Sequence, residues 1–160
     1  MNTTAVRSLA QPSTKLNMRK VVLYVNGAFL TLMGGPFAIF DLLSYFWGIG
    51  PLGATFHHVG NTVGLFEAHG LAFILGLLLL RAARWEPVAR WHLLGAGIHL
   101  LLGTSNLLFW LFIVAMDAVT AEIVITTIHW LFFGLQLVCF VLAKQTDKRW
   151  SGAGRSVRHD

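Results

Sequence analysis

The sequence predicts an all-α integral membrane protein, a four-helix bundle with both termini in the cytoplasm. Hydrophobic residues make up 56% of the chain and charged residues only 12%, whereas soluble domains carry about 25% charged residues. In addition, all 12 Lys and Arg residues lie outside four long apolar segments. The single cysteine, Cys139, excludes an intramolecular disulfide and a cysteine-ligated metal site.

Each of the four apolar segments has the roughly 20 residues that a helix needs to cross the hydrocarbon core of a bilayer. The linkers between them are too short to hold a second domain, so residues 21–143 are predicted to form a single domain. The four predicted spans are residues 21–47, 59–80, 92–115 and 123–143.

The positions of the basic residues predict the orientation of these helices. They occur before the first segment, between the second and third, and after the fourth, and the other two linkers contain none. Because cytoplasmic segments are enriched in Lys and Arg, residues 1–20, 81–91 and 144–160 are predicted to be cytoplasmic. Residues 1–20 lack a signal-peptide cleavage motif, so we expect the first helix to be retained. The predicted location is the cell (inner) membrane. The net charge of +5 is therefore assigned to orientation and lipid headgroups, and not to nucleic-acid binding.

The first segment contains the sequence MGGPF. Pro36 cannot donate a hydrogen bond to the carbonyl of Leu32, and Gly34 and Gly35 loosen the same turn. We therefore predict a kink at this point, with a pocket just beneath Asp41, which lies near the outer end of the helix.

The second segment opens with Glu67 and His69, two residues apart. On a helix such residues point about 200° away from each other. Ionisable groups within a membrane are costly and mark functional sites by default. We expect Glu67 to face the interior near Asn106 and His129, and His69 to lie at a helix–helix contact.

The third and fourth segments each carry a polar stripe, because their polar and small residues recur at intervals of three and four and so share one helix face. We expect the two stripes to face each other in the bundle interior, where glycines allow close helix approach. One stripe comprises His92, Gly95, His99, Gly103, Asn106 and Trp110, and the other comprises Glu122, Thr126, His129, Phe133 and Gln136.

These residues predict a polar pocket open toward the outer leaflet. The candidate catalytic residues are Glu67 and Asp41, because a positioned carboxyl group can act as general acid or base. Structural roles remain open for two of these residues. Asn106 would also stabilise the bundle by hydrogen bonds between helices. Glu122 would also be a favourable negative charge at a helix N-terminus. Trp110 and Trp130 lie too deep for the aromatic belts and are expected to wall a cavity or fill the core. The candidate ligand-binding residues are His99, Asn106, Trp110, His129 and Trp130.

A haem is an alternative, because imidazoles on two facing helices can hold haem iron from both sides. His69 and His129 lie at similar depths and would form this pair. No histidine pair has the spacing of four residues found in metal-binding helices, and no nucleotide-binding loop, nucleophile elbow or thiol motif occurs. No metal ligand is assigned, and the cofactor remains unassigned.

The stretches GAFLTLMGGPFAIFD and VGLFEAHGLAFILGLLLLRAAR resemble the DoxX-like family of small four-helix membrane proteins. The likeness covers residues 21–110 and implies a four-helix fold, with links to quinone-dependent redox subunits or membrane partners. The stretches GIHLLLGTSNLLFW and TTIHWLFFG are more polar than that family. The positions that carry the likeness are Gly34, Gly35, Glu67, Gly70 and Gly76.

A fainter resemblance is to the EXPERA group of sterol isomerases and sigma-2-type receptors, small helical bundles with ionisable residues around a lipophilic cavity. It rests on analogy of fold and residue order alone. The residues in compatible order are Asp41, Glu67, His99, Asn106 and the pair His129–Trp130.

The sequence therefore predicts a multi-pass membrane protein that binds a lipophilic small molecule, namely a quinone, an isoprenoid or a lipid. If it is an enzyme, isomerisation or cyclisation by acid–base catalysis suits these residues. The alternatives are a non-catalytic DoxX-like subunit of a membrane redox complex and a b-type haem protein. The expected partners are the bilayer, the ligand, and either another membrane protein or a second copy of the chain.

Overall fold

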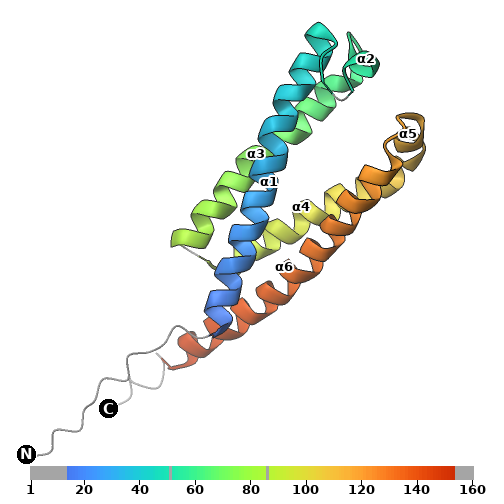
Figure 1. Cartoon of the computed structure of the whole chain (residues 1–160). Helices are drawn as coiled ribbons and strands as arrows, with labels where there is room; N and C mark the ends of the chain where they lie inside the picture. Colours follow the sequence, from blue (N-terminus) through green and yellow to red (C-terminus); the bar gives the residue numbers. More distant parts are fainter. Residues whose placement is uncertain (1–13, 51, 86, 154–160) are drawn as a thin grey trace, which may run out of the picture.

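A computed structural model describes residues 14–50, 52–85 and 87–153, and these residues are helical with no strand among them (Figure 1). The predicted all-α class is confirmed. In chain order the helices are α1 (Thr14–Trp47), α2 (Gly53–Phe56), α3 (Asn61–Trp85), α4 (Ala89–Leu108), α5 (Trp110–Ala115) and α6 (Val119–Ala153).

Three stretches are long and apolar enough to cross a membrane: Leu16–Trp47 in α1, Asn61–Trp85 in α3 and Val119–Gln145 in α6. Their large apolar side chains are widely exposed, with Leu32 69% and Leu131 62% accessible. Such faces suit a lipid environment, because the usual burial of apolar surface is not needed where the solvent is itself apolar.

The third predicted span is not one continuous helix. Residues 92–115 are divided between α4 and α5, with a break at Phe109, where φ is −97° and ψ is 25°. Thr104, Ser105 and Asn106 lie in the last turns of α4 before the break, and side chains of this kind compete with backbone hydrogen bonds. α4 is not among the candidate spans.

The first and last predicted helices are shorter than the helices in the structure. α1 begins at Thr14 instead of residue 21, and α6 continues to Ala153, past the predicted end at residue 143. The predicted tails, residues 1–20 and 144–160, are thus partly helical; residues 1–13 and 154–160 lie outside the described part of the chain.

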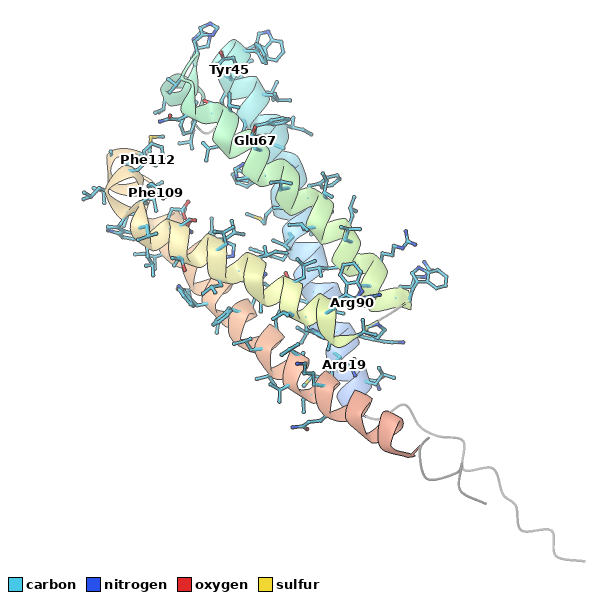
Figure 2. The ribbon with its side chains drawn as sticks, turned by 180° about the vertical axis from the view of Figure 1, so that it is seen from behind. Arg19, Tyr45, Glu67, Arg90, Phe109 and Phe112 are labelled. Atoms are coloured by element: carbon cyan, nitrogen blue, oxygen red, sulfur yellow. The ribbon has the colours of Figure 1, made fainter. Side chains whose placement is uncertain are left out.

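The long helices pack as two pairs, α1 with α3 and α4 with α6. The pairs meet where α1 begins and α6 ends, and they diverge toward α2 and α5 (Figure 1). We call the first of these the basic end, because Arg19 and Arg90 lie there, and the second the loop end, where Tyr45, Phe109 and Phe112 lie (Figure 2). At the basic end Arg19 donates a hydrogen bond to the backbone carbonyl of Pro87, so the start of α1 is joined to the α3–α4 linker.

Glycines bring the backbones of α1 and α3 into direct contact. A Cβ on Gly34 would lie 2.6 Å from the carbonyl oxygen of His69, and one on Gly76 would lie 2.6 Å from the amide nitrogen of Thr31. Small residues at such positions allow close packing of membrane helices. Pro36, where a kink was predicted, lies within α1, which is a single helix through this residue.

The apolar core lies near the basic end, where the two helix pairs meet. Leu23, Leu30 and Leu79 are almost completely buried, and Ala82 and Ala83 complete the cluster. These five residues belong to α1 and α3, and Trp91, Ile98 and Leu102 of α4 pack against them, so the core also joins the two pairs.

Candidate functional site

The two polar stripes of the third and fourth predicted helices face each other as expected. They form hydrogen bonds between α4 and α6 at three successive levels along the helices. These are His92 Nδ1 to Gln136 Oε1 at 2.7 Å, His99 Nδ1 to His129 Nδ1 at 2.9 Å, and Asn106 Nδ2 to both Glu122 Oε2 at 2.9 Å and Thr126 Oγ1 at 3.0 Å.

The middle level also includes α1. His99 is completely buried, and its Nε2 lies 2.8 Å from Oδ1 of Asn26, which is equally buried. Because Oδ1 is an acceptor, His99 Nε2 donates, and its Nδ1 then accepts the proton of His129 Nδ1. Phe132 stacks on the His99 ring at a centroid distance of 4.9 Å and excludes water from it.

Sequence reasoning did not identify Asn26 as a site residue. The available signal was an amide side chain within the apolar run VVLYVNGAFL, where an unpartnered polar group would be costly. Its partner lies 73 residues away in the chain, and no local spacing connects the two.

The level nearest the basic end contains His92, Gln136 and Gly95. His92 and Gln136 are completely buried. A Cβ on Gly95 would lie 2.8 Å from Gln136 Nε2 and 3.2 Å from Asn26 Nδ2, so both amide groups pack directly against this glycine and leave no room for a side chain. Neither amide nitrogen has a hydrogen-bond partner among the described residues.

A second polar pair lies between α1 and α3. The Asp41 carboxylate is buried, and its Oδ2 lies 2.6 Å from His69 Nδ1. The prediction that His69 lies at a helix–helix contact is confirmed.

Asp41 forms part of the wall of a half-open pocket near the loop end, with a volume of about 170 Å³. It lies beside Asp41 and toward the end of α1, not beneath it as the predicted kink implied. The other lining residues are mainly aliphatic and aromatic: Leu42, Tyr45, Phe46, Thr62, Val63 and Phe66.

The prediction that Glu67 faces the interior near Asn106 and His129 is wrong. Glu67 is exposed and makes no hydrogen bond or ion pair with any described residue. It shares the outer face of α3 with Leu71 and Ile74, which are 59% and 53% accessible. The reason is geometric: the face that carries His69 packs on α1, and Glu67 points about 200° away from that face.

The two tryptophans do not fill the core. Trp130 is 36% accessible, and its indole lies against Gly103, 3.2 Å from the position of a Cβ there. Trp110 is the first residue of α5 and is half-buried. Both therefore lie at the edge of the α4–α6 contact and not inside it.

The residues suggested for haem do not fit a bis-histidine site. His129 is directed to His99 and His69 to Asp41, so each predicted axial ligand already has another partner. Within residues 14–50, 52–85 and 87–153, no three His, Cys, Asp or Glu side chains lie close enough together to hold a metal ion.

No protein-family model matches the chain, and neither a curated protein nor a solved structure matches it significantly. The resemblance to the DoxX-like family thus stays a prediction from the quoted motifs, and function is argued from the geometry of the site.

Proposed function

We propose that the chain is a multi-pass inner-membrane protein with four spans and with both ends of the helical domain in the cytoplasm. Support comes from the three apolar stretches and from the basic end, where Arg19 and Arg90 lie together (Figure 2). The fourth span is α4, which runs beside α6. Its polar face is hydrogen-bonded to α6, and this removes most of the penalty for placing His99 and Asn106 in lipid.

We further propose that the protein binds a lipophilic small molecule with a polar head, such as a quinone or an isoprenoid, at the Asp41–His69 pair. The observation that carries this proposal is a buried carboxylate, hydrogen-bonded to an imidazole, in the wall of an otherwise apolar pocket. Binding sites for small molecules typically combine apolar walls with a few placed polar groups.

The size of the pocket limits what it holds. Typical ligand pockets measure about 300–1,000 Å³, and this one measures about 170 Å³. It therefore holds a polar head group, and the apolar remainder of the molecule extends along the exposed surfaces of Phe46 and Val63 into lipid. Such a ligand reaches the site laterally from the bilayer.

Asp41 is the group placed to exchange a proton with the bound head group, because it lines the pocket. His69 holds the carboxylate in position through its Nδ1 and exchanges the proton with it. An acid–base pair of this kind serves isomerisation or cyclisation, and it equally serves protonation of a reduced quinone.

Mass spectrometry of the organic extract of gently purified protein tests this proposal. We expect one lipophilic molecule other than bulk phospholipid, in stoichiometric amount, in the wild type. Asp41→Asn keeps the size of the side chain but removes its charge, and the variant should retain much less of that molecule. Glu67→Gln makes the same chemical change on the exposed face of α3 and should retain it fully.

Two results would contradict the proposal. Bulk phospholipid alone in the wild-type extract would favour the non-catalytic subunit. Equal loss of the molecule from Asp41→Asn and Glu67→Gln would show that it is not bound at the Asp41–His69 pair.

A further inference from the structure

The pocket beside Asp41 has few polar side chains in its wall, and each has a definite hydrogen-bonding character. They are Asp41, Tyr45 and Thr62, whereas the other lining side chains are aliphatic or aromatic. No lysine or arginine occurs in residues 21–80, the stretch from which the whole described wall is taken. This wall therefore carries one carboxylate and no basic side chain.

The Asp41 carboxylate has an acceptor to spare. Its Oδ2 lies 2.6 Å from His69 Nδ1 and accepts a hydrogen bond from it, whereas Oδ1 makes no hydrogen bond with any described residue. An ionised carboxyl group accepts hydrogen bonds at both oxygens and donates none. Because Asp41 is buried and lines the pocket, a ligand that donates to Oδ1 satisfies an acceptor that lipid cannot satisfy.

Most donors near the pocket are already used. Thr62 Oγ1 donates its single proton to the carbonyl oxygen of Phe56 at 3.3 Å, so only its lone pairs are left. The amides of Thr62 and Val63, in the first turn of α3, each donate to the carbonyl oxygen three residues earlier, at 3.1 and 3.2 Å. A helix N-terminus usually offers such amides to an anion, but these two are occupied.

We propose that the polar head of the ligand is a hydrogen-bond donor, which for a quinone or an isoprenoid means a hydroxyl group, and that it donates to Asp41. The inference rests on the proposed function, because it takes this pocket as the binding site, and it specifies the class of head group. The Tyr45 hydroxyl both donates and accepts, so it does not discriminate between head groups.

This chemistry separates ligands that share the same apolar tail. A hydroxyl matches the free acceptor of Asp41, whereas the negative charge of Asp41 repels a phosphate or a carboxylate. A carbonyl or an ether oxygen leaves that acceptor without a partner. The pocket is therefore expected to bind a hydroquinone in preference to the quinone, and a free isoprenoid alcohol in preference to its diphosphate.

Three probes with the same ring and tail isolate the head group. 4-Dodecylphenol donates a hydrogen bond, 4-dodecylanisole has a methyl ether in place of the donor, and 4-dodecylbenzoate is an anion. Their affinities for the purified full-length protein in detergent are compared by native mass spectrometry. A hydrogen bond to a charged acceptor changes affinity by about 10- to 100-fold, so the phenol should bind more tightly than the anisole by this factor. The benzoate should bind more weakly than the phenol.

The chain offers a matched pair of variants. Asp41→Asn removes the negative charge, so the preference for the phenol over the anisole should fall by about threefold or more, while the affinity for the benzoate should rise. These opposite changes cannot come from a misfolded protein, which would lose all three probes. Glu67→Gln makes the same substitution on the exposed face of α3 and should leave the three affinities unchanged.

Equal affinities of the phenol and the anisole for the wild type would overturn the inference, as would an unchanged preference in Asp41→Asn. An extracted molecule without a hydrogen-bond donor would also overturn it. If the wild type nevertheless yields a stoichiometric lipophilic molecule that Asp41→Asn lacks, the proposed function stands with a different head group. A preference for the phenol that Asp41→Asn reduces, together with only bulk phospholipid in the extract, would support the donor-selective pocket and contradict the proposed resident ligand.

Discussion

Replacing His99 with leucine is expected to destabilise the protein strongly. His99 is completely buried and joins α1 to α6 through Asn26 and His129. The substitution leaves both partners without a hydrogen bond, and an unsatisfied buried polar group costs about 1–3 kcal/mol. Thermal or denaturant unfolding in detergent should therefore show a loss of stability of about 2–6 kcal/mol for the two groups.

His57 provides the control for this measurement. It lies in the exposed turn that follows α2, where no packing between long helices depends on it. His57→Leu should unfold within about 0.5 kcal/mol of the wild type, as surface substitutions usually do. Equal stability of His99→Leu and His57→Leu would mean that the three-helix contact at His99 does not exist in the folded protein.

Replacing Gly76 with alanine is expected to separate α1 from α3. The added Cβ would lie 2.5 Å from Thr31 Oγ1 and 2.6 Å from the amide nitrogen of Thr31. Because one of these neighbours is backbone, a side-chain rotation cannot relieve the overlap, and the helices must move apart. Overpacking of this kind costs about 1–3 kcal/mol and occasionally more. Reduced yield and a lower unfolding temperature should follow.

Gly70 lies on the same helix and gives a matched comparison. A Cβ there would have no atom within 4 Å. Since alanine also has a higher helix propensity than glycine, Gly70→Ala should be neutral or slightly stabilising. If the two variants unfold alike, the close α1–α3 contact is not part of the folded structure.

Periodicity predicted most of the α4–α6 contact. Intervals of three and four placed His92, His99 and Asn106 on one face, and all three have partners on the predicted opposite stripe. The prediction succeeded because polar side chains on an otherwise apolar helix need hydrogen-bond partners, and the facing polar stripe supplies them. Hydropathy also predicted the approximate positions of the long helices α1, α3, α4 and α6, but not the division of the third predicted span between α4 and α5.

Rotation of α3 could not be predicted from its sequence. Glu67 and His69 were correctly expected on opposite faces, but both faces contain glycine and leucine, so composition did not show which one packs on α1. The close approach of Gly76 to Thr31 decides the rotation, and it places His69 inside. The contact between Asn26 and His99 likewise could not be predicted from the sequence, because it depends on how the two helix pairs meet.

The break at Phe109 had only a weak local signal. Three consecutive residues that favour side-chain to backbone hydrogen bonds, Thr104, Ser105 and Asn106, occur just before it. Apolar residues continue beyond the break to Ala115, so hydropathy alone extended the predicted helix through it.

The central question of the proposed topology is whether α4 crosses the membrane, because both ends of the helical domain lie on the same side only with an even number of spans. Labelling of single introduced cysteines with a membrane-impermeant reagent on intact cells measures this directly. The native Cys139 is buried and contributes little background. Suitable positions are Ala54 and Thr120 at the loop end and Arg84 at the basic end, all of them exposed. Ala54 is preferred to Gly53, where a side chain would overlap the backbone of Gly48.

With four spans, Ala54→Cys and Thr120→Cys are both labelled from outside, and Arg84→Cys is labelled only after the cells are permeabilised. Thr120 is the decisive position, because it follows α4 and α5 and lies in the first turn of α6. Labelling of Ala54→Cys from outside together with protection of Thr120→Cys would show that α4 does not cross the membrane, and this result would contradict the account.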